Sequence, residues 1–135
     1  MYTIRKIFKM EFAHQLFDAY SKACCNLHGH SYVCELFLTS ETLDETGMVR
    51  DFKSVKDQVG EYINSWDHCT VLPDTLPKEY LECIQKYNSK VKIVNYNPTA
   101  EAMSKDIYET IKKVIPEVSK VRLHETTTGW AEYSE

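Results

Sequence analysis

The sequence predicts an α+β fold in which an antiparallel, four-stranded sheet carries two main helices on one face. Two segments near the N-terminus alternate apolar and polar residues with the period of a strand, and two later segments place apolar residues at helical spacing. The 135 residues suffice for one hydrophobic core and contain no internal repeat, low-complexity tract or linker. We therefore expect residues 1–135 to form a single domain.

The two expected N-terminal strands run from Tyr2 to His14 and from His28 to Leu38. In the first, the even positions are Tyr, Ile, Lys, Phe, Met, Phe and His, so one mostly apolar face ends in a histidine. In the second, His28 and His30 occupy alternate positions and should therefore point in the same direction.

The first main helix is expected to begin at Asp51, which follows a turn around Gly47 and can cap the helix N-terminus. Its apolar positions recur at helical spacing and comprise Val55, Val59, Ile63 and Trp66. The segment from Pro73 to Pro77 interrupts this pattern. A short helix around 80–87 and a strand at 91–96 should follow.

The second main helix should open at Asn97-Pro98-Thr99, because proline suits a first helical turn and Asn or Thr can accept hydrogen bonds from unpaired backbone N–H groups. Its apolar stripe comprises Met103, Ile107, Ile111 and either Val114 or Ile115, and Pro116 ends it. The last strands are expected at 120–125 and 130–133. Such a sheet leaves its edges unprotected, so we expect self-association into a homo-oligomer.

The charge and the cysteine content limit which partners and which cellular location we expect for the protein. The formal net charge is −4 and the pI is near 5.7, whereas proteins that coat nucleic acid or anionic membranes carry a basic face, so we expect neither partner. The sequence has no apolar run of membrane-spanning length and no signal-peptide block at its start, which indicates a cytoplasmic protein. Its five cysteines, an odd number without a CxxC pair, are expected to be reduced thiols.

Three histidines form a candidate metal site. About 6.6 to 6.8 Å should separate the backbones of His28 and His30 along a strand, and an antiparallel neighbour can present His14 between them. Neutral imidazole is a natural zinc ligand, and three protein ligands leave one tetrahedral position open for water or substrate, as in catalytic zinc centres. We therefore predict a Zn²⁺ site at His14, His28 and His30. The alternative is three ordinary sheet histidines.

Four further residues are candidates for chemistry. Cys24 lies four positions before His28, and a nearby metal would favour a thiolate able to act as base or nucleophile. The adjacent Asp67 and His68 could form a carboxylate-oriented imidazole for proton transfer. Glu125, at the end of an apolar strand, could accept paired N–H donors from a heterocycle. The residues alone also allow a buried structural thiol, a chance Asp-His pair and a solvated strand end.

Taken together, these segments resemble the family of 6-pyruvoyl-tetrahydropterin synthases and 6-carboxy-tetrahydropterin synthases. The matching segments span nearly the whole chain in the family's order, and they are Phe12-Ala13-His14, Cys24-x-x-x-His28-Gly29-His30, Gly47-Met48-Val49-Arg50-Asp51-Phe52, Asp67-His68, Asn97-Pro98-Thr99-Ala100-Glu101 and Glu125-Thr126. The resemblance implies the tunnelling fold (T-fold), in which the sheets of several subunits join into a barrel. It also implies trimers stacked into a hexamer, with active sites between subunits.

The resemblance assigns roles to the candidate residues. The three histidines would hold zinc, and Cys24 would be the base. His68, oriented by Asp67, would be its proton-transfer partner and would reach across a subunit boundary. Glu125 would anchor the pterin ring and so take part in catalysis.

Thr99 and Glu101 would lie near the same pterin ring. The three residues between Cys24 and His28 resemble the 6-carboxy-tetrahydropterin branch, which serves queuosine biosynthesis, whereas the pyruvoyl branch typically carries five. The chain departs from the family at Cys25, an extra thiol. It also lacks an Asn after Leu72, so we expect segment 73–91 to be locally reshaped.

The implied activity is that of a zinc-dependent lyase. It would convert 7,8-dihydroneopterin triphosphate to 6-carboxy-5,6,7,8-tetrahydropterin, acetaldehyde and triphosphate. One alternative is a 6-pyruvoyl-tetrahydropterin synthase, which eliminates triphosphate from the same substrate but retains the three-carbon side chain. Another is a noncatalytic, metal-stabilised pterin-binding protein.

Overall fold

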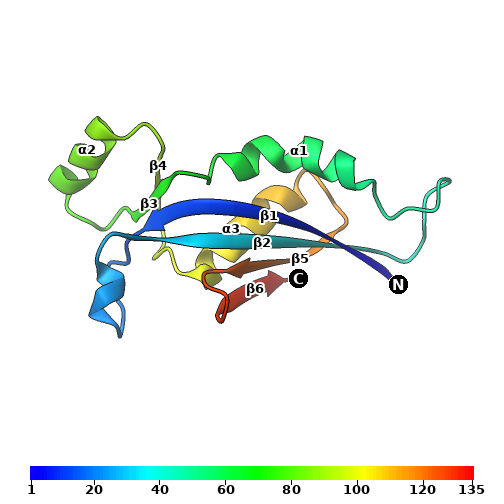
Figure 1. Cartoon of the computed structure of the whole chain (residues 1–135), viewed down its shortest axis with the longest axis horizontal. Coiled ribbons are helices and arrows are strands. Elements are labelled where there is room, and N and C mark those ends of the chain that lie inside the picture. Colours follow the sequence, from blue (N-terminus) through cyan, green and yellow to red (C-terminus); the bar gives the residue numbers. More distant parts are fainter.

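A six-stranded sheet with the strand order β4-β3-β1-β2-β5-β6 organises the computed structural model, which describes all residues 1–135 (Figure 1). The strands are β1 (Tyr2–His14), β2 (His28–Ser40), β3 (Thr70–Pro73), β4 (Val91–Val94), β5 (Val118–His124) and β6 (Trp130–Ser134). The α-helices are α1 (Phe52–Asn64), α2 (Lys78–Tyr87) and α3 (Ala100–Lys112), and a 3-10 helix spans Lys22–Cys25. The predicted α+β class is confirmed.

The sheet is mixed, so the predicted four-stranded antiparallel sheet is wrong. Strands β1, β2, β5 and β6 pair antiparallel, but β3 pairs parallel with both β1 and β4. Sequence patterning missed β3 because it has only four residues, three of them buried, and shows no alternation. Pro73, interpreted as a break, is the last residue of this strand.

The long β1–β2 pair sets the geometry of the histidines. These two strands of 13 residues pair over their whole length, from Tyr2 opposite Ser40 to His14 opposite His28. His30 lies opposite Phe12. Residues 15–27, which contain the 3-10 helix, connect the histidine ends of the two strands.

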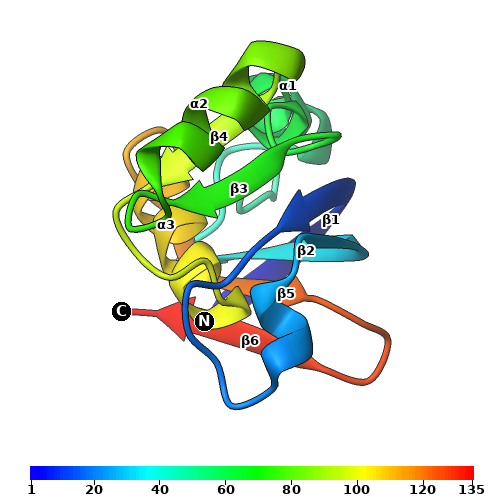
Figure 2. The same ribbon diagram turned by 90° about the vertical axis from the view of Figure 1, so that its left-hand side faces the viewer.

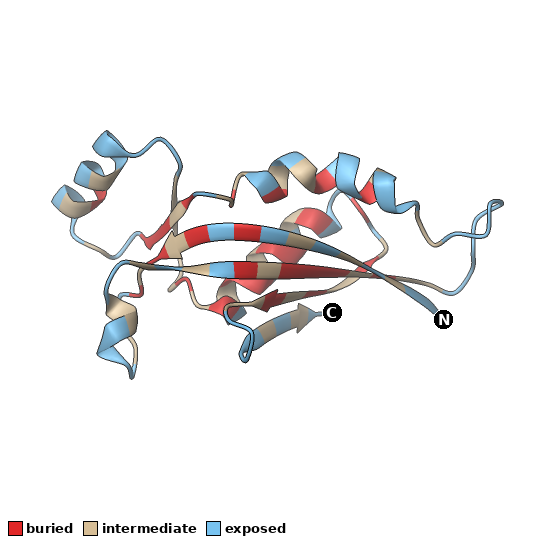
Figure 3. Ribbon diagram, viewed as in Figure 1, coloured by how far each residue is buried: buried red, intermediate tan, exposed pale blue.

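Helices α1 and α3 pack on one face of the sheet and enclose the core (Figures 1 and 2). Buried residues concentrate along the middle of β1, β2 and β5 and on the inner sides of these two helices (Figure 3). The predicted stripe Val55, Val59 and Ile63 is buried in α1. At the end of α3, Ile115 is buried whereas Val114 is 49% exposed, which decides between the two alternatives.

Both predicted capping residues begin their helices. The Asp51 carboxylate accepts a hydrogen bond from Ser54 N at 3.0 Å, and Thr99 Oγ1 accepts one from Ala102 N at 3.2 Å. Pro98 precedes the α3 cap and is not part of the first turn. Thr99 is therefore fixed at the helix end that faces the histidines.

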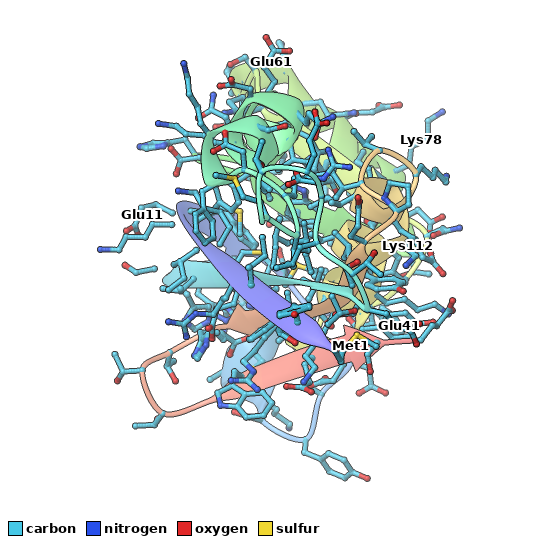
Figure 4. All side chains as sticks on the ribbon, turned by 90° about the vertical axis from the view of Figure 1, so that its right-hand side faces the viewer. Met1, Glu11, Glu41, Glu61, Lys78 and Lys112 are labelled. Atoms are coloured by element: carbon cyan, nitrogen blue, oxygen red, sulfur yellow. The ribbon has the colours of Figure 1, made fainter.

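Charged residues cover the outer surfaces, as shown by Glu61 on α1 and Lys78 on α2 (Figure 4). α2 lies apart from α1 and α3, beside the end of the sheet formed by β3 and β4 (Figure 1), and Leu81 is its one buried residue. No helix has the length and apolarity that a membrane crossing requires.

Candidate active site

His14, His28 and His30 converge where β1 ends and β2 begins, as predicted. One ligand nitrogen from each ring can be chosen so that all three lie within 4.8 Å of one another. The Nε2 atoms of His14 and His28 are 3.2 Å apart. Two nitrogens on a tetrahedral zinc, each about 2.0 to 2.1 Å from the metal, would be separated by about 3.3 to 3.4 Å, so this spacing fits a shared ion.

Backbone carbonyls fix the tautomers of two of these rings. His14 Nδ1 donates to Pro98 O at 2.8 Å, and His28 Nδ1 donates to Asn26 O at 2.7 Å. Because a carbonyl only accepts, each neutral ring carries its proton on Nδ1 and leaves a lone pair on Nε2. Two such lone pairs facing each other at 3.2 Å repel unless a cation lies between them. The ring arrangement therefore matches a metal site with carbonyl groups orienting the ligands.

Burial favours a metal over a proton as that cation. His14 is 2% exposed, and burial lowers its pKa, although the Pro98 carbonyl and Glu125 act in the opposite direction. The buried Nε2 of His30 has no hydrogen-bond partner. A neutral imidazole with an unpaired buried nitrogen is suited to metal ligation.

Gly29 allows the close approach of the two histidine-bearing strands. A Cβ atom built on Gly29 would lie 3.2 Å from Phe12 O, which is tighter than ordinary van der Waals contact. The glycine of the His-Gly-His segment thus has a steric reason: it keeps β1 and β2 near enough for His14 to face His28.

A cavity of about 320 Å³ beside His14 gathers five of the nine predicted site residues. Its lining comprises His14, Leu16, Cys24, Thr99, Ala100, Glu101, Glu125, Thr126, Gly129 and Trp130. The volume lies in the range of small-molecule sites. A second cavity of about 690 Å³ adjoins it and shares Leu16, Thr99 and Glu101. Neither cavity is lined by Lys or Arg.

Cys24, rather than Cys25, lines the first cavity. Both thiols are half-buried at the end of the 3-10 helix. The spacing to His28 singled out Cys24, and both Cys24 and His14 line this cavity.

Glu125 lies next to the histidines as well as in the cavity wall. Its Oε1 is 3.5 Å from His30 Nε2, and its Oε2 is 4.0 Å from His14 Nε2. The carboxylate side chain remains 33% exposed, and the backbone N–H donates to Gly129 O in the β5–β6 turn. Glu125 can therefore face either a ligand in the cavity or a cation at the triad.

Asp67 and His68 form the predicted pair but lie outside the cavity of this chain. Asp67 Oδ2 is 3.1 Å from His68 Nδ1, and its Oδ1 accepts from Glu11 N at 2.8 Å. The pKa of Asp67 is lowered, mainly by the Glu11 hydrogen bond, so the group stays a carboxylate. His68 has a left-handed φ of 61° and its side chain is 78% exposed. Non-glycine residues adopt this backbone conformation uncommonly, and such residues occur more often at active sites and in turns.

Sequence patterns missed the backbone contribution to this site. Pro98 and Asn26 act through their carbonyl groups, which no side-chain motif reveals, although Pro98 lies within the recognised Asn97-Pro98-Thr99 segment. Trp130 was placed on a strand but not in the site, and it forms part of the cavity wall.

The chain belongs to the 6-pyruvoyl tetrahydropterin synthase family, whose model matches residues 3–135. The 6-carboxy-5,6,7,8-tetrahydropterin synthase of Aquifex aeolicus is 41% identical over 123 residues, which cover 83% of this chain and 76% of that protein. The Haemophilus influenzae protein of the same name is 32% identical over 100% of both chains.

Solved structures share the fold. The 6-pyruvoyl tetrahydropterin synthase of Caenorhabditis elegans superposes with a TM-score of 0.73 at 24% identity, covering 99% of this chain and 95% of that one. An uncharacterized protein of Wolinella succinogenes has a TM-score of 0.84 at 20% identity, covering 99% and 98%. The T-fold implied by the sequence resemblance is thus confirmed at the level of the chain.

Proposed function

We propose that this protein is a zinc-dependent 6-carboxy-5,6,7,8-tetrahydropterin synthase. It would convert 7,8-dihydroneopterin triphosphate and one water to 6-carboxytetrahydropterin, acetaldehyde and triphosphate, a reaction that serves queuosine biosynthesis; the water would supply the second oxygen of the new carboxyl group. The observation that carries the proposal is the cavity in which a metal ligand, a thiol and a carboxylate meet, namely His14, Cys24 and Glu125. The names of the Aquifex and Haemophilus relatives support the same activity.

Each residue would have a distinct task. His14, His28 and His30 would hold the metal, and a bound zinc would supply a Lewis acid for the oxygens of the substrate side chain. The Cys24 thiolate would take a proton from the carbon next to the ring. Glu125 would accept two N–H donors from the aminopyrimidinone edge of the pterin.

Thr99 and Glu101 would lie beside the same ring, since both line the cavity with Glu125. Thr99 is held in place by its cap on α3, whereas Glu101 is exposed and shared with the adjoining cavity. Neither of these two cavities supplies a Lys or Arg side chain for the triphosphate.

A homo-oligomer would complete the site. Only Ala13 and His14 of β1 pair with β3, so most of the β1 edge lies open, and β6 forms the other open edge of the antiparallel part of the sheet. Pairing of these edges between subunits would close a barrel. Exposed His68, oriented by Asp67, would then exchange protons in the cavity of a neighbouring subunit.

Product analysis tests the proposal. Zinc-loaded protein is incubated with 7,8-dihydroneopterin triphosphate, and the products are identified by mass, with the Cys24→Ala variant as control. Acetaldehyde and 6-carboxytetrahydropterin support the proposal. A product that retains the three-carbon side chain would make the protein a 6-pyruvoyl-tetrahydropterin synthase, and zinc binding without turnover would make it a noncatalytic pterin-binding protein.

A further inference from the structure

The turn that carries Cys24 is held by two hydrogen bonds to its peptide carbonyls. Leu16 N donates to Cys24 O at 3.1 Å, and the side-chain Nε2 of Gln15 donates to Cys25 O at 2.9 Å. Gln15 directly follows the metal ligand His14, and its own N–H donates to Val71 O in β3. The position of the thiol relative to the triad therefore depends on the orientation of the Gln15 amide.

Helix α2 fixes that orientation. The hydroxyl of Tyr80, in the first turn of α2, donates to Gln15 Oε1 at 2.6 Å. A primary amide accepts through its oxygen and donates through its nitrogen, so a donor on Oε1 leaves Nε2 pointed at Cys25 O. Tyr80, Gln15 and Cys25 are all half-buried, which shields the two hydrogen bonds from water in part.

Through this contact α2 acts on the site, although the helix contributes little to the core. The helix contributes one buried residue, Leu81, and no residue of the two cavities beside the triad. It belongs to segment 73–91, which we expect to be locally reshaped relative to the family. Tyr80 of this helix nevertheless contacts Gln15, which binds the turn of the expected base.

We propose that Tyr80 and Gln15 form a positioning relay that connects α2 to Cys24. The relay holds the 3-10 turn so that the thiol faces the cavity beside His14. It deepens the proposed function and rests on it for the catalytic consequence, but its structural consequence, restricted motion of the Cys24 turn, can be measured without substrate.

The first experiment measures the accessibility of Cys24 in the absence of substrate. The parent protein, Tyr80→Phe and Gln15→Leu are prepared with Cys25→Ala, so that Cys24 is the sole thiol of the turn, and alkylation by iodoacetamide is followed by mass spectrometry. Tyr80→Phe removes one hydrogen bond of the relay and Gln15→Leu removes both, and each change should release the turn and accelerate Cys24 alkylation about two- to tenfold. Exposed Cys83 serves as the internal reference, and its rate should not change.

Tyr87→Phe is the matched control. Tyr87 lies on the same helix and is 72% exposed, and its hydroxyl makes no hydrogen bond within the chain. Tyr87→Phe removes a tyrosine hydroxyl, as Tyr80→Phe does, but leaves the relay intact. The Cys24 alkylation rate of Tyr87→Phe should therefore equal that of the parent. Equal Cys24 rates in the parent, Tyr80→Phe and Gln15→Leu would overturn the proposal, as would equal acceleration at Cys24 and Cys83.

The second experiment measures turnover of the zinc-loaded variants without the Cys25 change. Tyr80→Phe and Gln15→Leu should each lower kcat about two- to tenfold with KM and zinc content unchanged. Because the two residues act in series, the double variant should lose no more than the single ones; multiplied losses would contradict a relay. If no variant and no parent turns over the pterin, the proposed function fails, while the alkylation result still decides the relay.

Discussion

His14 and His28 lie directly opposite each other in the β1–β2 register, with their Nε2 atoms 3.2 Å apart. Each ring is held in this position by a carbonyl acceptor on its other nitrogen, Pro98 O and Asn26 O. When both rings are neutral, the fold thus directs two Nε2 lone pairs at one point with no hydrogen between them. A metal ion between the two Nε2 atoms would relieve the repulsion of their lone pairs.

We expect His28→Ala to abolish zinc binding and activity without unfolding the sheet. The core contains neither His28 nor His30, and removal of one lone pair eases the repulsion in the metal-free state. Zinc at 100 times its dissociation constant should stabilise the parent by about 2.7 kcal/mol and the variant not at all. Thermal unfolding with and without zinc, together with metal analysis, measures both effects.

His68→Ala is the control for this prediction. Its side chain is 78% exposed and lies outside the triad, so zinc should stabilise this variant as it does the parent. Full metal content in His28→Ala would show that the three histidines are ordinary sheet residues.

We expect Cys24→Ala to keep zinc and lose turnover by about 100-fold or more, the usual contribution of a general base. Cys25→Ala should stay within about twofold of the parent, because Cys25 does not line the cavity and its carbonyl, which Gln15 binds, survives the change. Steady-state kinetics on zinc-loaded proteins compare the two. An inactive Cys25→Ala with an active Cys24→Ala would show that the base is Cys25 and not Cys24.

Local patterns predicted the elements that build the site. Alternation over β1 and β2 placed His14, His28 and His30 on facing strands, and capping chemistry placed Asp51 and Thr99 at helix starts. These features depend on neighbours in sequence or on period-2 pairing, so a single sequence contains them.

The missed features depend on contacts between distant segments. Strand β3 is too short to alternate, and its parallel pairing with β1 and β4 has no local signal. The Pro98 carbonyl reaches His14 across 84 positions, and Tyr80 reaches Gln15 across 65. Backbone acceptors and single tyrosines of this kind become visible only in the folded chain.

The side chain of Glu35, which lies on the sheet face opposite the helices, should make the stability of the protein dependent on acid pH. Burial alone would raise its pKa, but hydrogen bonds from His124 and Arg5, the latter at 2.7 Å, outweigh burial and lower it. Because the folded pKa lies below the unfolded value, the stabilisation is complete above the ordinary pKa of 4.5 and is lost as the pH falls through the folded pKa.

Glu35→Gln should therefore cost about 1 to 2 kcal/mol at pH 7, a modest value because Arg5 is half-exposed. The difference from the parent should shrink as the pH falls below 4.5. Denaturant unfolding at several pH values measures this. A constant difference across the acid range would mean that the carboxylate charge contributes nothing.

Glu125→Gln should weaken substrate recognition far more than zinc binding or assembly. A carboxylate accepts two hydrogen bonds from the aminopyrimidinone edge, whereas an amide offers one acceptor and one donor, so a pterin N–H would face another N–H. An unsatisfied buried partner costs about 1 to 3 kcal/mol, and catalytic efficiency should fall at least about tenfold.

Kinetics and metal analysis on the same preparation separate the possible roles of Glu125, which could also act on the metal because its Oε1 lies 3.5 Å from His30 Nε2. Loss of zinc in the variant would make Glu125 a fourth ligand, and unchanged kinetics would make it a solvated strand end. Reduced efficiency with full zinc content is the outcome expected of a pterin anchor.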